Sequence, residues 1–203
     1  MKKTKEKILD TAHQLFNEYG VADVSLRKIA ATMNISHGNL IYHFKTKNDI
    51  LEQLHERILI AALEENKRFK IEENPIIGLW QTAFSGFRIL YDYRFFMIDL
   101  NYIMRENPAL HERFKGLETV RAEMYQEAID RAIQKGLMRQ PEYSNEYIQL
   151  IERVRIFSDF WISSSAIYYS ENKNKTIEHH ASLFQSMFFP YLTIEGKKAL
   201  NNK

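Results

Sequence analysis

The amino-acid sequence predicts an all-α protein, and three observations support that prediction. Apolar residues recur at helical spacing in almost every segment, and no segment shows the sustained alternation that is typical of strands. Helix-capping residues precede several of these segments, and glycine follows others. The chain has 203 residues, of which 45% are hydrophobic and 27% are charged, which is ordinary for a folded protein with a substantial core. We therefore expect about nine helices and no sheet.

Residues 1–48 are expected to contain three helices. Apolar residues between Ile8 and Tyr19 mark one face of the first helix, which ends at Gly20, a residue suited to the left-handed backbone just past a helix end. Ser25 is expected to cap the second helix and Ser36 the third. Two short helices joined by a tight turn and braced by a longer one form a helix-turn-helix domain. Its predicted core consists of Leu15, Phe16, Leu26, Ile29, Leu40 and Phe44.

Residues 49–203 are expected to form a second, helical domain. Thr46 and Asp49 resemble a capping box for the helix that leads into it, and Asn74-Pro75 is a cap followed by proline at the first helical position. A helical segment from Phe95 up to Asn107 is expected next. The last three helices are expected over about 108–136, about 143–171 and about 176–193.

The composition excludes several classes of protein. The chain has no cysteine, so it has neither disulfides nor thiolate metal sites. No apolar run approaches the length of a membrane span, and the N-terminal segment MKKTKEKILD leads directly into an amphipathic pattern, so we expect a cytoplasmic protein with no membrane partner. Residues 1–54 hold eight Lys or Arg against six Asp or Glu, whereas the rest of the chain balances at 20 against 20. The basic excess therefore lies in the N-terminal part.

No residue pattern indicates catalysis, a cofactor or a metal. The seven glycines form no phosphate-binding loop, and the serines at 163–165 do not occur in a nucleophile-elbow pattern. His179 and His180 are adjacent, so they cannot share one helix face as a metal-binding pair would. We expect no catalytic residue, no cofactor and no metal site.

The stretch ISHGNLIYHFKTK, residues 35–47, has a composition that favours contact with a partner over a purely structural helix. Glycine and asparagine are poor residues for a helix interior, and polar rings and lysines favour water or a partner. In a helix-turn-helix the second helix enters the DNA major groove, where its exposed side chains meet base edges. If Leu40 and Phe44 face inward, the outward or flanking positions are Ser36, His37, Asn39 and Tyr42.

Individual residues of this domain suit different contacts with DNA. The amide of Asn39 can bind adenine through two hydrogen bonds, and Gly38 allows DNA to approach closely. Lys47 and Arg27 can hold phosphates, together with the backbone donors near Ser25. The lysines among the first seven residues can follow a phosphate backbone, although a lysine-rich terminus can also serve solubility alone.

Three segments of the first 51 residues, TKEKILDTAHQLFNEYG, SLRKIA and GNLIYHFKTKNDIL, resemble the N-terminal domain of the tetracycline-repressor (TetR/AcrR) family in order and spacing. The resemblance implies that the starts of the second and third helices contact the DNA backbone and the bases, respectively. One departure is that Ile41 occupies the position of the family's usual tyrosine, and Tyr42 follows one place later. The residues expected to bind DNA are Lys3, Thr4, Ser25, Arg27, Ser36, His37, Gly38, Asn39, Tyr42, His43 and Lys47.

The resemblance also implies a role for the C-terminal domain. Proteins similar to this one bind a ligand with their C-terminal helices and form homodimers through the last two, here about 143–171 and about 176–193. Aromatic residues of this region either line a cavity for a flat or apolar ligand or fill the core, and nearby polar groups favour the cavity. The residues expected to bind the ligand are Trp80, Phe84, Phe87, Arg88, Tyr102, Arg121, Tyr125, Phe157 and Trp161.

The expected function is that of a sequence-specific, DNA-binding transcription regulator. Its expected partners are a palindromic double-stranded DNA operator, an unidentified small molecule and a second copy of the chain. We expect a repressor that leaves the operator when the small molecule binds. Two alternatives stay open: a helical enzyme or carrier with a vestigial DNA-binding domain, and a DNA-binding protein that responds to no ligand.

Overall fold

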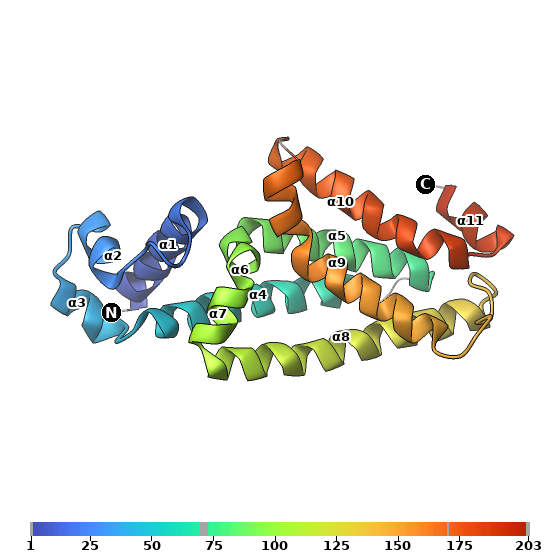
Figure 1. The fold of residues 1–203 in the computed structure, drawn as a ribbon, viewed down its shortest axis with the longest axis horizontal. Coiled ribbons are helices and arrows are strands. Elements are labelled where there is room, and N and C mark those ends of the chain that lie inside the picture. Colours follow the sequence, from blue (N-terminus) through green and yellow to red (C-terminus); the bar gives the residue numbers. More distant parts are fainter. Residues whose placement is uncertain (1, 70–72, 170, 202–203) are drawn as a thin grey trace.

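The computed structural model describes residues 2–69, 73–169 and 171–201, which form an elongated, helical molecule (Figure 1). Three helices lie at one end, and a larger helical body forms the rest. In the described part of the chain we find eleven α-helices, one short 3-10 helix and no strand. They are α1 (Lys2–Tyr19), α2 (Leu26–Thr32), α3 (His37–His43), α4 (Lys47–Phe69), α5 (Pro75–Asp92), α6 (Arg94–Ile98), α7 (Leu100–Glu106), α8 (Pro108–Gln134), α9 (Glu146–Tyr168), α10 (Lys173–Phe188), η1 (Phe189–Tyr191) and α11 (Ile194–Asn201).

The local signals that predicted the three N-terminal helices are confirmed. Gly20 ends α1 with a φ of 80°, and Asn34 in the turn between α2 and α3 has a φ of 54°, a conformation that glycine and asparagine tolerate. The hydroxyls of Ser25 and Ser36 each accept the backbone N–H of the residue three positions later and so cap α2 and α3. The predicted core is buried at Leu15, Phe16, Ile29, Leu40 and Phe44, and Leu26 is half-buried.

Helix α4 connects the N-terminal helices with the body. Thr46 and Asp49 form the expected capping box: the Thr46 N–H donates to the Asp49 carboxylate at 2.9 Å, and the Asp49 N–H donates to the Thr46 hydroxyl at 3.1 Å. Farther along α4, Arg57 bonds the α1 carboxylates of Glu6 and Asp10, the latter at 2.8 Å. One continuous helix therefore carries the N-terminal domain and is tied to its first helix.

Helix α5 is central in the body, where it packs against α4, α8 and α10. Helix α9 packs against α6, α8 and α10, and α8 runs along the opposite edge of the body (Figure 1). Helix α10 runs from the middle of the molecule toward the end opposite the helix-turn-helix, where α11 lies (Figure 1). The body is thus a layered bundle in which α5 contacts most of its neighbours.

Two segments differ from the sequence-based expectation and raise the number of helices from nine to eleven. The segment expected from Phe95 to Asn107 is divided into α6 and α7 by a break at Asp99. The helix expected to end at about residue 193 ends at Phe188, because Pro190 lacks an N–H donor and a 3-10 turn forms there. The chain then continues as α11, which no sequence pattern had predicted.

Candidate DNA-binding surface and ligand cavity

The outward face of α3 consists of polar side chains. His37, Gly38 and Asn39 are exposed, and Tyr42 is 71% exposed, whereas Leu40 is fully buried against the core. The backbone N–H of Asn39 donates to the Ser36 hydroxyl at 3.1 Å, but its side-chain amide has no hydrogen-bond partner among the described residues. The amide is therefore available for an external partner.

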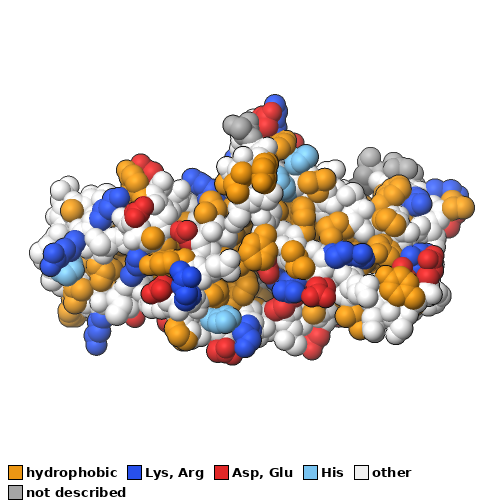
Figure 2. Space-filling view, in the orientation of Figure 1, with side chains coloured by type: hydrophobic (Ala, Val, Ile, Leu, Met, Phe, Trp, Pro, Cys, Tyr) orange, Lys and Arg blue, Asp and Glu red, His pale blue; other side chains and the backbone are white. Residues whose placement is uncertain are grey.

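Other predicted DNA-binding residues surround this face. Lys3, Ser25, Arg27 and Ser36 are exposed, and Thr4 and His43 are half-buried. The Arg27 guanidinium has no partner within the described part of the chain. Figure 2 shows basic side chains at the end of the molecule where α2 and α3 lie. The structure thus brings these predicted residues to one end of the molecule.

Lys47 is placed differently from the other predicted DNA-binding residues. It is half-buried, and its ammonium group donates a hydrogen bond to the Val21 carbonyl oxygen at 2.6 Å. The same group lies 5.7 Å from the ring centroid of Tyr102, within reach of a cation–π interaction. Lys47 therefore contacts the loop between α1 and α2 and helix α7, in addition to any contact with DNA.

Helices α6 and α7 form the junction between the N-terminal domain and the body. The Asp99 carboxylate accepts the Val21 N–H at 2.7 Å, the Asn17 side-chain oxygen accepts the Phe95 N–H at 3.0 Å, and the Asn48 amide donates to the carbonyl oxygen of Glu106 at 3.0 Å. Sequence reasoning missed these residues. No local signal could have identified them, since the partners lie more than 50 positions apart in the chain.

The residues predicted to bind a ligand do not form one site. Phe87, Phe157 and Trp161 pack together in the body: the ring of Phe87 lies 4.8 Å from Trp161 and 6.2 Å from Phe157, between centroids. Tyr125 packs at 6.4 Å from Phe184, which in turn contacts Phe87. These rings therefore pack against one another inside the body.

Three polar members of the predicted set lie elsewhere. Arg88 is exposed, and Tyr102 is at the junction with the N-terminal domain. Arg121 on α8 bonds the buried carboxylate of Asp159 on α9 at 2.9 Å and also Glu118. Burial lowers the pKa of Arg121, but these two carboxylates raise it above its ordinary value. Arg121 therefore stays charged and links α8 to α9.

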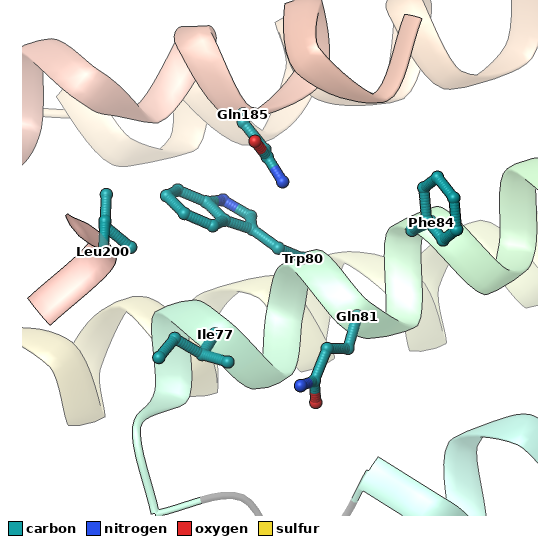
Figure 3. A pocket seen from close by; sticks show the side chains of 6 residues that line it. All are labelled: Ile77, Trp80, Gln81, Phe84, Gln185 and Leu200. Atoms are coloured by element: carbon teal, nitrogen blue, oxygen red, sulfur yellow. The ribbon is translucent and has the colours of Figure 1, made fainter. Parts of the chain in front are cut away.

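The remaining two predicted residues, Trp80 and Phe84, line a cavity between α5, α10 and α11 (Figure 3). The cavity has a volume of about 310 Å³. Its lining residues are Ile77, Trp80, Gln81, Phe84, Gln185 and Leu200. Gln185 and Leu200 come from helices more than 100 positions along the chain from Trp80, so sequence spacing could not associate them with it.

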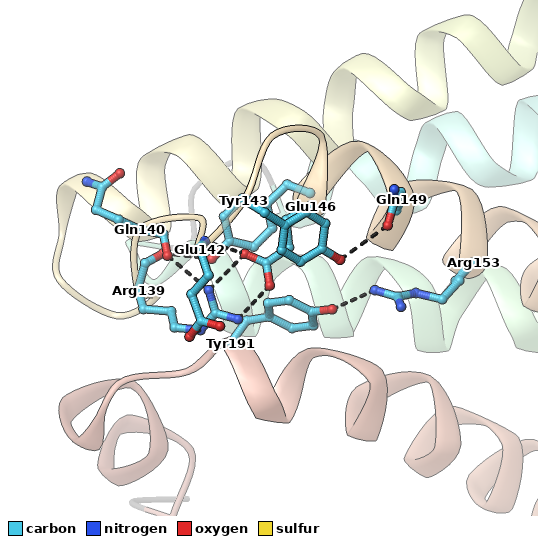
Figure 4. Close-up of polar contacts among 9 residues, drawn as sticks. Arg139, Gln140, Glu142, Tyr143, Glu146, Gln149, Arg153 and Tyr191 are labelled. Carbon is cyan, nitrogen blue, oxygen red and sulfur yellow. Dashed lines mark hydrogen bonds and ion pairs between the residues drawn. The ribbon is translucent and has the colours of Figure 1, made fainter.

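A polar cluster at the far end of the body has a structural role (Figure 4). The Arg139 guanidinium donates to both oxygens of the buried Glu146 carboxylate, at 2.7 and 2.9 Å, and stacks 5.1 Å from the Tyr191 ring. The Glu142 N–H donates to Glu146, and the Tyr147 hydroxyl donates to the Arg139 carbonyl oxygen. The cluster fixes the loop between α8 and α9 against η1.

The described residues contain neither a membrane-spanning helix nor a cluster suited to a metal ion. None of the described helices combines the length and the apolar character needed to cross a membrane. The described ranges also contain no group of three or more His, Asp or Glu side chains that could hold a metal ion.

Comparison with known proteins identifies relatives of both domains. A family model described as bacterial regulatory proteins of the tetR family matches residues 8–54, and a second, described as bacterial transcriptional repressor, matches residues 49–200. Helix-turn-helix transcriptional regulators of Staphylococcus aureus are 30% identical (strain USA300) and 35% identical (strain MRSA252) over 82 residues. Each match covers 40% of this chain and 44% of the relative, so the chain spans less than half the length of these relatives.

Solved structures share the fold along nearly the whole chain. A TetR-family regulator from Marinobacter aquaeolei VT8 is 23% identical with a TM-score of 0.83, covering 98% of this chain and 96% of that one. A regulator from Saccharomonospora viridis, solved with choline, is 16% identical with a TM-score of 0.77, covering 93% and 97%. Because the second family model alone matches most of the chain, the protein belongs to the TetR family of DNA-binding bacterial transcription regulators.

Proposed function

We propose that this chain is a homodimeric repressor that binds a palindromic DNA operator through α3 and releases it when a small molecule occupies the helical body. The observation that carries the DNA-binding part is the outward face of α3, where the Asn39 amide is exposed and unpaired among the described residues. An asparagine amide can donate a hydrogen bond to N7 of adenine and accept one from its N6 amino group. The exposed Arg27 can hold a flanking phosphate. The proposal places the protein in the cytoplasm and assigns it no catalytic role.

The homodimer is supported by apolar side chains that this chain leaves exposed. On α9 they are Ile156, Phe160 and Ile167, which are 50%, 42% and 73% exposed, and on α10 Leu183 is 41% exposed. Figure 2 shows hydrophobic side chains over the end of α9 and the start of α10. An apolar surface of this kind favours a partner over water. These two helices are the ones expected to form a four-helix bundle with a second copy.

Dimerisation has a physical purpose for DNA recognition. One seven-residue recognition helix reads few bases, whereas a two-fold dimer reads two half-sites about 34 Å apart, or one turn of DNA. The ligand would favour a form of the dimer in which the spacing of the two α3 helices no longer matches the spacing of the two half-sites. Among structurally similar regulators, one was solved with choline and another, SmeT, with triclosan, which supports a small-molecule site in this body as well.

The division at residue 48 is part of the proposal, with residues 1–48 binding DNA and residues 49–203 binding the ligand and the second copy. Continuous α4 would then transmit a change in the body to α3 directly. The contacts of Asp99 and Lys47 with Val21 supply a second connection between the two parts.

The test is a selection of bound fragments from random and genomic duplexes, with purified full-length chain at about 0.15 M salt, where much of the weak phosphate-only binding is lost. The proposal predicts one enriched inverted repeat with half-sites about one helical turn apart. Uniform recovery without a motif contradicts it and favours the alternative of a vestigial DNA-binding domain. Sedimentation of the protein with and without the selected duplex measures whether the bound species is a dimer.

A further inference from the structure

The cavity between α5, α10 and α11 has walls of a particular chemistry. Ile77, Phe84 and Leu200 are apolar, and Figure 3 shows the Trp80 indole lying between α5 and α10, with Gln185 extending toward it from α10. A volume of about 310 Å³ is at the lower end of the range for small-molecule pockets, about 300 to 1,000 Å³. The space therefore suits a compact molecule of one or two rings.

The polar groups of the cavity lack hydrogen-bond partners among the described residues. The Trp80 ring nitrogen is buried, yet it has no hydrogen-bond acceptor among the described residues. An indole N–H can only donate, and a buried donor without an acceptor is costly. The side-chain amides of Gln81 and Gln185 are also unpaired in the described structure. A bound molecule that carries an acceptor would satisfy the indole, and the amides can both donate and accept.

All six lining residues are uncharged. A charged ligand would lose its hydration on entering and would meet no opposite charge among them, which is unfavourable. The chemistry of the walls thus selects a neutral molecule. Arg121, another residue of the set predicted to bind the ligand, lies outside this cavity, and its charge is already matched by two carboxylates.

Helix α11 closes one side of the cavity, and its position depends on a close backbone contact. A Cβ atom at Gly196 would lie 2.1 Å from the Leu137 carbonyl oxygen, so only glycine fits there. The neighbouring Thr193 fixes the same contact, since its N–H donates to the Leu137 carbonyl oxygen at 3.0 Å. This docking places Leu200 at the cavity beside Trp80 (Figure 3).

Helix α10 lines the cavity and also belongs to the proposed dimer interface. Gln185 lies two positions after the exposed Leu183, so the two side chains point to nearly opposite sides of α10. A molecule in the cavity would contact α5 on one side and α10 on the other. It would thereby act on the helix whose outer face is proposed to contact the second copy.

We propose that this cavity takes a neutral, largely apolar one- or two-ring molecule with a hydrogen-bond acceptor for the Trp80 indole, held between α5, α10 and α11. The site rests on the proposed ligand control of DNA binding, which it makes specific. It differs from the aromatic cluster around Phe87 and Trp161, whose side chains are packed against one another.

The test uses the two tryptophans of the chain as separate reporters. Full-length protein labelled with ¹⁵N-tryptophan gives two indole resonances, which Trp80→Phe assigns. Quinolin-2-one, a neutral bicyclic compound with a carbonyl acceptor, is titrated as the probe, and 2-naphthoate serves as a charged compound of similar shape. We expect quinolin-2-one to shift the Trp80 resonance to saturation, to leave that of Trp161 in place, and to bind at least tenfold more tightly than 2-naphthoate.

Variants locate the contact by calorimetry. Trp80→Phe keeps an aromatic wall but removes the donor, and we expect it to weaken quinolin-2-one binding about fivefold, which is the usual effect of one neutral hydrogen bond. Gln185→Leu is expected to weaken it as well, while Gln134→Leu at an exposed position of α8 serves as the matched control and should leave binding unchanged. The proposal is overturned if Trp80 does not respond at millimolar probe, if Trp161 responds instead, or if 2-naphthoate binds as tightly.

The same samples are titrated with the selected operator duplex. Intact operator binding with no Trp80 response overturns the cavity site and leaves the DNA-binding regulator in place. A saturable Trp80 response in a protein that selects no operator supports the cavity site and overturns the proposed repressor function.

Discussion

The ammonium group of Lys47 lies 2.6 Å from the carbonyl oxygen of Val21 and donates a hydrogen bond to it. The backbone N–H of Val21 donates a second hydrogen bond, to the Asp99 carboxylate at 2.7 Å. Both backbone groups of the fully buried Val21 are therefore held from outside its own loop, one by α4 and the other by the break between α6 and α7. This arrangement fixes the loop that leads into α2 relative to the body.

Replacing Lys47 by alanine is expected to destabilise the protein even without DNA. A hydrogen bond to a charged group contributes about 1.5 to 3 kcal/mol, so the free energy of unfolding should fall by roughly that amount. Urea unfolding of the DNA-free protein measures it. Lys45→Ala is the matched control, because Lys45 is exposed and has no partner in the described residues. Equal stability of the two variants would mean that the contact with Val21 does not form in solution.

Stability is expected to fall between about pH 6.5 and pH 4 because of His55. Burial of this side chain, with a smaller effect of Arg113, lowers its pKa from 6.5 to about 4. In the unfolded chain, His55 binds a proton below about pH 6.5, whereas in the folded chain it does so only below about pH 4. The stabilisation is thus complete above pH 6.5 and is lost as pH falls, by up to about 3 kcal/mol.

Urea unfolding at pH 7.5 and pH 4.5 tests this explanation. His55→Leu should lose less stability over that interval than the unmodified protein, and His111→Gln, at an exposed position of α8, should behave like the unmodified protein. A decrease of the same size in His55→Leu would show that other groups cause the pH dependence.

The Glu146 carboxylate is expected to stabilise the fold at neutral pH and to lose this effect in acid. The hydrogen bond from Arg139, with another from the Glu142 N–H, lowers its pKa from 4.5 to about 2. Its contribution is therefore present above pH 4.5 and is lost as pH falls toward 2. Glu146→Gln should melt at a lower temperature than Glu142→Gln at pH 7, since Glu142 is 70% exposed. Melting curves at lower pH should show the gap between Glu146→Gln and the unmodified protein closing, and a gap that stays constant would contradict the assignment.

Gly196→Ala is expected to displace α11. The added methyl group would meet the Leu137 carbonyl oxygen, and overpacking of this kind costs about 1 to 3 kcal/mol. Gly116→Ala on α8 is the control, because a Cβ there meets no atom within 4 Å, and it should stabilise the helix by about 0.5 to 1 kcal/mol. Thermal unfolding of both variants measures the difference. If both substitutions stabilise, α11 does not dock on the loop after α8.

Local features of this protein could be predicted from the sequence, and contacts between distant segments could not. Caps at Ser25 and Ser36 and the left-handed Gly20 depend on residues within four positions, so their signals are visible in the chain. The break at Asp99 is stabilised by Val21, which is 78 positions away, and no local pattern reports such a contact.

The ligand cavity shows the same limit for side chains. Aromatic residues at helical spacing are equally compatible with a packed core and with a cavity wall, so Phe87 and Trp80 were indistinguishable in the sequence. They differ only in what the neighbouring helices bring to them. Phe87 meets the rings of Trp161 and Phe184, whereas Trp80 faces Gln185 and Leu200 across an open space.

The most direct test of the central claim measures the affinities of the unmodified protein, Asn39→Ala and Gln134→Ala for the selected operator and for an unrelated duplex at one salt concentration. A bidentate contact to one base contributes about 1 to 3 kcal/mol of discrimination, so Asn39→Ala should reduce the ratio of these affinities about 5- to 150-fold while binding the unrelated duplex as before. Gln134→Ala should retain the full ratio. If Asn39→Ala also retains the full ratio, α3 does not read bases through this residue, and the proposed recognition surface is contradicted.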